Sequence, residues 1–383
     1  MILPTMSKGA EMNRNLLLVA ALVAAMLTGG CVSPEARLQQ RYAEGLRPYT
    51  ELGLERARFT RVWEQNLNLA AYDVRPAPKP RIRNVWLYED TLLAAGSDGV
   101  IHAFDRRTGA VLWLVDLPTL PGHRPYQVDG AFYGVTGNRF FSISRTGALE
   151  LGARFPFSLS APLVATDEYV FAASGAGEVR KLSITTLGEI WPGPAAFAGA
   201  VVVEPVGMGP YLIVASTAGE IEALDMITSG RQTRFRARDS ISGIAVDADH
   251  IYAGSRDYYT YCITPGGTVR WRTIIGAAVV GAPLLSGDAL YVETLGRGAT
   301  ALTRGRGEIL WQNPGATKIL SSGGGYVFAR SSQDELWLID AESGETLQRL
   351  YIGDFDLMPR NTFDDGLVYL VTDQGRLVCL RAL

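Results

Sequence analysis

Histidine, lysine and cysteine are all scarce in this chain of 383 residues, and their scarcity excludes several classes of function. The three histidines, His102, His123 and His250, are isolated and lack the His-x-His or His-Glu-x-x-His spacing of a metal site. With only four lysines and a net charge of −3, the chain offers no basic face for nucleic acid. No Gly-x-Ser-x-Gly elbow presents a nucleophile. We therefore expect no catalytic, cofactor-binding or metal-binding residues and no enzyme activity.

Cysteine occurs three times, at Cys31, Cys262 and Cys379. In an exported protein the last two could form a disulfide. Both, however, fall where other copies of an internal repeat carry alanine, such as Ala103 and Ala223. A free cysteine behaves as a small buried hydrophobe. We expect that role for Cys262 and Cys379.

Long apolar runs are also missing, except for residues 16–27 near the N-terminus. As a helix this run of 12 residues would rise about 18 Å, less than the ~30 Å hydrocarbon core, so a permanent membrane span is not expected. Arg14 precedes the run, and small residues lead from it to Cys31. This layout predicts a signal peptide over residues 1–30.

The small-small-Cys ending of this segment resembles the bacterial lipobox, in which cleavage leaves the cysteine as an acylated N-terminus. Thr28 stands where the lipobox usually has leucine, and an ordinary signal peptide with an incidental cysteine is the alternative. The resemblance implies lipidation at Cys31, whose acyl chains would anchor the protein stably. Val32 stands where an aspartate would retain a lipoprotein at the inner membrane, which implies the outer membrane.

Residues 31–58 separate the predicted anchor from the first predicted strand. Ser33 followed by Pro34 is typical of a helix start, as N-cap and first-turn residue. We expect a short helical spacer there. The Pro-rich residues 75–83 predict an extended linker.

An internal repeat with a period of about 39 residues fills most of the chain. Each copy contains four short runs of β-branched and aromatic residues, separated by turns rich in glycine and aspartate. A period near 40 with four strands per unit predicts a β-propeller. The copies are aligned on the glycine of a Thr-Gly-type turn: Gly109, Gly147, Gly188, Gly230, Gly267, Gly307 and Gly344.

The two ends of the repeat region predict the number of blades. The last copy stops at residue 383 without its Thr-Gly turn or Trp strand, whereas residues 59–67 carry Trp63 before the first copy begins. Pairing this N-terminal strand into the last blade would close the ring and bury exposed strand edges. We therefore predict an all-β, eight-bladed propeller of four-stranded blades over residues 59–383.

The repeated residues are interpreted as structural. Gly109 allows a positive φ in its turn, and the side chains of Asp105, Asp225 and Asp340 bind the amides of their own turns. The tryptophans are expected to pack between blades; they are Trp113, Trp191, Trp271 and Trp311, with Trp63 in the closing strand.

Two kinds of charged stretch are interpreted as surface. The acidic residues 353–356 and 363–365 are expected in turns and solvated loops at blade edges rather than as metal ligands. The Arg-rich residues 230–238 are interpreted as the solvent face of a strand, with a binding patch for an acidic partner as the alternative.

The repeated Asp, Thr-Gly turn and Trp resemble the PQQ-type repeat of quinoprotein propellers over roughly residues 59–383. With the lipid-attached Cys31 and the eight-bladed ring, the chain is similar to the BamB-type lipoproteins of the outer-membrane β-barrel assembly machinery. The resemblance implies a non-catalytic scaffold on the periplasmic face of the outer membrane, monomeric outside its complex, with a barrel-assembly protein as partner. The alternative is a propeller that binds a small ligand or PQQ in its central channel; short connections and the lack of adjacent cysteines count against PQQ.

Overall fold

The computed structural model describes residues 33–43, 45–67 and 80–383. The predicted signal peptide, the predicted lipidation site Cys31 and most of the Pro-rich residues 75–83 lie outside the described residues.

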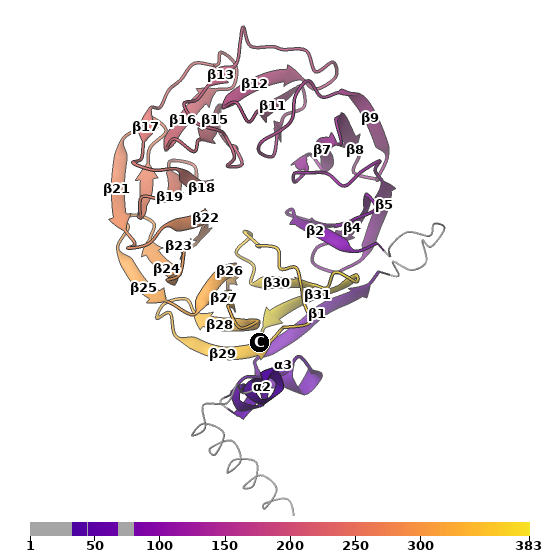
Figure 1. Ribbon diagram of the computed structural model, residues 1–383, viewed down its shortest axis with the longest axis vertical. Helices are drawn as coiled ribbons and strands as arrows, with labels where there is room; N and C mark the ends of the chain where they lie inside the picture. The colour runs from indigo at the N-terminus through magenta and orange to yellow at the C-terminus, as the bar shows by residue number, and fades with distance from the viewer. Residues whose placement is uncertain (1–32, 44, 68–79) are drawn as a thin grey trace, which may run out of the picture.

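Eight sheets stand in a ring, and the chain passes through them in order, as the colour gradient shows (Figure 1). Seven sheets have four antiparallel strands, numbered from the centre of the ring outwards. Blade 1 contains β2 (Ile82–Leu87), β3 (Thr91–Gly96), β4 (Val100–Asp105) and β5 (Val111–Asp116); blade 2 contains β6 (Tyr126–Val128), β7 (Ala131–Thr136), β8 (Arg139–Ile143) and β9 (Leu149–Arg154); blade 3 contains β10 (Val164–Ala165), β11 (Tyr169–Ala173), β12 (Glu178–Ser183) and β13 (Ala195–Ala196); blade 4 contains β14 (Val206–Met208), β15 (Tyr211–Ala215), β16 (Glu220–Asp225) and β17 (Phe235–Arg236). Blade 5 contains β18 (Ile241–Val246), β19 (Ile251–Ser255), β20 (Tyr259–Ile263) and β21 (Val269–Ile274); blade 6 contains β22 (Val279–Ser286), β23 (Ala289–Thr294), β24 (Gly298–Thr303) and β25 (Ile309–Asn313); blade 7 contains β26 (Ala316–Gly323), β27 (Tyr326–Ser331), β28 (Glu335–Asp340) and β29 (Thr346–Tyr351).

Blade 8 closes the ring with strands from both ends of the described propeller. Its order is β1 (Phe59–Asn66), β31 (Arg376–Ala382) and β30 (Leu367–Val371), with Trp63 opposite Cys379. At the innermost position there is only an isolated bridge between Leu357 and Val371. The predicted eight-bladed ring and its closure by an N-terminal strand are therefore confirmed, although the fourth strand of blade 8 is reduced to this bridge.

The hydrophobic core lies in layers between neighbouring blades. The layer between blades 8 and 1, for example, contains Trp63, Phe104, Tyr369 and Cys379. Cys379 and Cys262 are free and buried, as predicted. Burial raises the pKa of the Cys262 thiol to about 11 and that of the Cys379 thiol to about 12, so both stay protonated at neutral pH.

The inner strands are much shorter on one side of the ring. In blades 2, 3 and 4 they have 3, 2 and 3 residues, whereas β22 and β26 have 8 each. The connections that lead into the short strands are long: residues 117–125, 155–163 and 197–205. In blades 2, 3 and 4, irregular connecting segments therefore occupy part of the space that a longer inner strand fills in blades 6 and 7.

Two short helices lie outside the ring, beside β1 and β29 (Figure 1). They are α2 (Pro34–Ala43) and α3 (Glu51–Arg56), and Ser33 Oγ accepts the Ala36 amide at 3.2 Å at the start of α2. Between the helices, Arg47 forms a parallel bridge with Leu350 of blade 7. None of the helices in the described part of the chain has the length and hydropathy that crossing a bilayer requires.

Candidate functional site

Indole rings join successive blades at four junctions. Each of these tryptophans lies against the glycine in the Thr-Gly-type turn of the next blade, and a Cβ on that glycine would come within 2.6 Å of the tryptophan side chain. The pairs are Trp63 with Gly109, Trp113 with Gly147, Trp271 with Gly307 and Trp311 with Gly344. At three of them the indole N–H also donates to a backbone carbonyl: Trp63 to Arg106, Trp271 to Arg304 and Trp311 to Ala341, at 3.0, 2.8 and 2.9 Å.

Asp105 is the first residue of the turn that contains Gly109, and its side chain accepts hydrogen bonds from that turn. Its Oδ1 accepts the amides of Arg107 and Thr108 at 3.0 and 2.8 Å, and the Thr108 hydroxyl at 2.8 Å. Partial burial alone would raise the pKa of Asp105, but these hydrogen bonds hold it below its usual value. Asp225 and Asp340 make the same three contacts in blades 4 and 7.

The turn alignment is wrong at Gly188 and Gly230. The positive φ falls one residue earlier in these copies, on Leu187 at 56° and on Ser229 at 63°. The turn is closed by the amide of Ser229, which donates to the Asp225 carbonyl at 3.0 Å. Gly230 therefore follows the left-handed position and does not occupy it.

The junctions around blades 3 and 4 differ accordingly. Trp191 is buried against Phe171, with ring centroids 5.6 Å apart, and its N–H has no hydrogen-bond partner. At the next junction Thr233, not an indole, faces Gly267. Trp191 still packs between blades 3 and 4, in one core layer with Phe171 and Leu224. These two junctions lack only the contact between an indole and a turn glycine: Ser229 holds the left-handed position of the blade 4 turn, and Gly267 of the blade 5 turn faces a threonine.

Arg106, which the sequence comparison of repeats does not single out, links blade 8 to blade 1. Its side chain is 1% exposed and pairs with Asp365 at 2.6 Å, while it donates to the Tyr369 hydroxyl and the Glu89 carbonyl at 3.0 Å each. The Phe363 ring centroid lies 4.5 Å from the guanidinium carbon. Asp365, Tyr369 and Phe363 reach Arg106 only in the closed ring, so no local sequence motif indicates this residue.

The acidic residues 363–365 were expected at a blade edge, but they lie elsewhere. They belong to the segment between β29 and β30 that projects toward the middle of the ring (Figure 1). Asp365 pairs with Arg106 of blade 1, and Asp364 accepts the Ser286 hydroxyl of blade 6. Nearby, Arg360 pairs with Glu293 of blade 6 and donates to the Ile319 carbonyl of blade 7 at 3.2 Å. Blade 8 lacks a full inner strand, and side-chain hydrogen bonds and ion pairs to blades 1, 6 and 7 hold this segment instead.

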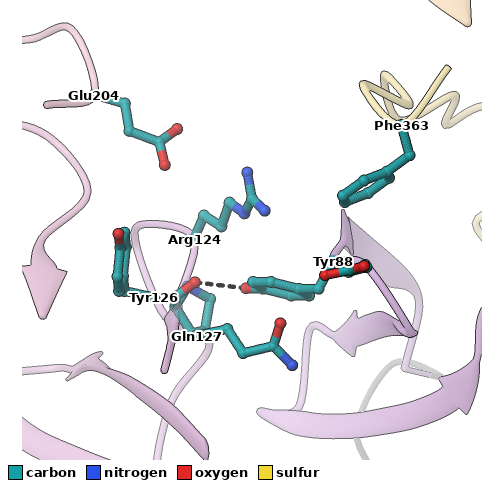
Figure 2. Close-up of a pocket in the computed structure, with 8 residues that line it drawn as sticks. Tyr88, Arg124, Tyr126, Gln127, Glu204 and Phe363 are labelled. Atoms are coloured by element: carbon teal, nitrogen blue, oxygen red, sulfur yellow. Dashed lines mark hydrogen bonds between the residues drawn. The ribbon is translucent and has the colours of Figure 1, made fainter. Parts of the chain in front are cut away.

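A cavity of about 300 Å³, here called the central cavity, lies where blades 1, 2, 4 and 8 face one another (Figure 2). Its lining comprises Tyr88, Glu89, Arg124, Pro125, Tyr126, Gln127, Glu204 and Phe363. Tyr88 and Glu89 follow β2, Arg124 and Pro125 precede β6, and Glu204 precedes β14. The cavity therefore brings together aromatic and charged side chains that are far apart in the sequence and outside the repeated positions.

The Arg-rich residues 230–238 lie on the outer edge of blade 4. Arg231, Arg234, Arg236 and Arg238 are all exposed, in agreement with the solvent-face interpretation. Arg231 pairs with Glu222, and Arg236 donates to a carbonyl of its own blade at 3.2 Å.

The three histidines lie in separate environments. His102 is buried in β4, where burial lowers its pKa, His123 lies 3.2 Å from the Leu159 carbonyl, and His250 is beside Asp247. Within the described residues, no group of three or more His, Cys, Asp or Glu side chains could hold a metal ion.

Comparison with known families decides the assignment of the fold. The family described as outer membrane protein assembly factor BamB, a PQQ-repeat family, matches residues 97–234 and 217–382. The chain belongs to this family. A crystal structure of BamB from Moraxella catarrhalis superposes with a TM-score of 0.67 at 16% identity, covering 84% of this chain and 97% of that one. The computationally designed Ika8 protein superposes with a TM-score of 0.57 at 13% identity, covering 80% of this chain and 98% of that one. No curated protein matches by sequence.

The PQQ repeat of the BamB family raises the question of a quinone cofactor. PQQ is an aromatic tricarboxylate, and several cations would be needed to bind it. The central cavity offers Arg124 together with the carboxylates of Glu89 and Glu204, which would repel it. The residues present in the central cavity therefore do not fit this cofactor.

Proposed function

We propose that this protein is a non-catalytic scaffold for outer-membrane protein assembly, anchored by lipid at Cys31 on the periplasmic face of the outer membrane. The observation that carries the proposal is the match of an outer-membrane assembly factor family to nearly the whole propeller, residues 97–382. The links between blades support it, because a rigid ring presents fixed surfaces to a partner protein. No PQQ or other cofactor takes part in this role.

The outer strand β5 is the edge that we propose contacts the partner. Its exposed side chains are apolar: Val111, Leu112 and Leu114 are 63, 49 and 42% exposed. Edge strands are usually protected by charge or proline, but β5 reads VLWLVD, with its only charge at the end. An exposed apolar edge of this kind favours contact with another protein, and the barrel-assembly protein is the partner that the family assignment supports.

The test is affinity purification of the full-length protein from gently solubilised membranes of its own host, with mass spectrometry of the co-purifying proteins. We expect recovery of the outer-membrane barrel-assembly protein, and its loss when Leu112 and Leu114 are both changed to Glu. Leu151→Glu on β9, where the leucine is 37% exposed, is the matched control and should retain the partner. A preparation free of barrel-assembly components would refute the scaffold role.

The anchor is tested separately by fractionation. Cys31→Ser should move the protein from the membrane to the soluble periplasmic fraction, because acylation requires the thiol. Membrane association that persists in this variant would refute lipid attachment at Cys31.

A further inference from the structure

Arg124 enters the central cavity in an orientation that its neighbours fix. Its Nη2 donates to the Leu87 carbonyl at 2.7 Å, and its guanidinium carbon lies 4.6 Å from the centroid of the Tyr88 ring. Tyr88 is itself buried, and its hydroxyl donates to the Pro125 carbonyl at 2.5 Å. Since blade 1 holds the guanidinium of Arg124 through the Leu87 carbonyl and the Tyr88 ring, this cation needs little reorganisation to meet an anion.

Glu204 provides the opposite charge from another wall. Figure 2 shows its carboxylate across the central cavity from Tyr88 and Phe363, with the Arg124 guanidinium between them. Within the described part of the chain, Glu204 makes no hydrogen bond or ion pair. Burial, followed by the negative charge of Glu204, raises the pKa of Tyr126, so the carboxylate of Glu204 acts electrostatically on this wall of the central cavity.

The aromatic walls are also held in place. Phe363 lines the central cavity, and the buried Arg106 lies 4.5 Å from its ring centroid. Tyr126 lies across from it at the start of β6. An apolar group between these rings would be removed from water on two sides.

We propose that the central cavity binds a compact zwitterion, in which an anionic group meets Arg124, an ammonium meets Glu204, and a small apolar body lies between Phe363 and Tyr126. A simple anion would be repelled by Glu89 and Glu204, and a simple cation would leave Arg124 without a counter-charge, so a ligand with both charges uses all the charged groups of the lining. The volume of about 300 Å³ limits the ligand to the size of an amino acid or dipeptide. A phosphoethanolamine group carries the same pair of charges and is the second source of this chemistry.

The test is isothermal titration of the full-length protein in detergent with four probes: glycyl-phenylalanine, its N-acetyl form, its C-terminal amide, and phosphoethanolamine. The variants are Arg124→Gln and Glu204→Gln. Arg139→Gln and Glu150→Gln, on β8 and β9, are matched controls outside the central cavity. Thermal melting checks that each variant is folded; Glu204→Gln breaks no hydrogen bond or ion pair among the described residues.

We expect the dipeptide to bind the unaltered protein and to bind each cavity variant at least about 10-fold more weakly, as loss of a charged partner predicts. The N-acetyl form should be insensitive to Glu204→Gln and the amide insensitive to Arg124→Gln, because each lacks the matching charge. Tighter binding of phosphoethanolamine with the same dependence on both variants would support the proposal and assign a headgroup as the source. Absence of saturable binding by every probe, or equal weakening by the control variants, would overturn it.

Discussion

Trp63 and Gly109 are 46 positions apart in the sequence but lie in direct contact, with the indole of the closing strand against the turn of blade 1. A Cβ on Gly109 would be 2.6 Å from the ring, and the φ of this glycine is 74°. The same residue therefore meets two independent requirements, left-handed backbone and close approach of an aromatic ring.

Gly109→Ala should for this reason destabilise the protein by about 3 kcal/mol, combining left-handed strain with overpacking. Gly193→Ala is the control, since nothing lies within 4 Å of the position its Cβ would take and its φ is not positive. Chemical denaturation followed by tryptophan fluorescence measures both. Equal stability of the two variants would show that the Trp63 contact does not constrain the turn.

Trp311 and Trp191 are both buried, but only the indole N–H of Trp311 has a partner, the Ala341 carbonyl at 2.9 Å. Trp311→Phe loses packing and also leaves that carbonyl without its donor, and we expect a cost of about 2–3 kcal/mol. Trp191→Phe removes an unsatisfied N–H and should cost about 1 kcal/mol less. The free energies of unfolding of the two variants give the comparison, and a larger loss at Trp191 would contradict the assignment of partners.

Arg106→Gln should destabilise ring closure by about 3–5 kcal/mol, because it removes a buried guanidinium and leaves Asp365 and the carbonyl of Glu89 without their charged donor. The adjacent Arg107 is exposed, so Arg107→Gln should change stability by less than about 0.5 kcal/mol. Limited proteolysis with N-terminal sequencing locates the effect. We expect early cleavage of the Arg106→Gln variant in blade 8 or blade 1, and cleavage confined to distant blades would argue against the closing role.

Asp247 gives the protein a defined sensitivity to acid. Partial burial would raise its pKa, but hydrogen bonds from Arg304, Tyr252 and nearby amides lower it to about 2, from an ordinary value of 3.8. The ionised Asp247 therefore stabilises the fold at any pH above its pKa in the unfolded state. This stabilisation, about 2 kcal/mol, is lost as the pH falls from 4 to 2, through the pKa of the folded state.

Asp247→Asn removes this titration. The difference in free energy of unfolding between the unaltered protein and Asp247→Asn should be constant at neutral pH and shrink as the pH is lowered from 4 toward 2. Denaturation curves at a series of pH values measure it. A difference that does not change with pH would show that Asp247 ionises normally in the folded state.

Prediction from sequence succeeded where the structure depends on local, repeated chemistry. The turn of Asp105 and Gly109 recurs with Asp340 and Gly344, because a turn of this kind needs an amide acceptor and a left-handed residue, and this need shows in the sequence. It failed at Gly188 and Gly230, where one extra residue shifted the turn without changing its appearance in the sequence. Alignment on the glycine alone does not detect such a shift, because the turn is defined by backbone hydrogen bonds that residue 229 makes whatever its side chain.

The sequence by itself determined the propeller, its number of blades and the closing strand, because the strand runs and turn residues repeat along the chain and Trp63 stands outside the first copy while the last copy lacks its Trp strand. Only the tertiary structure decided that Arg106 meets Asp365, and that Arg124 and Glu204 face one cavity. These contacts join blades that are distant along the chain, and they form when the ring closes. Which residues meet in these contacts depends on the geometry of the closed ring and not on any spacing in the sequence.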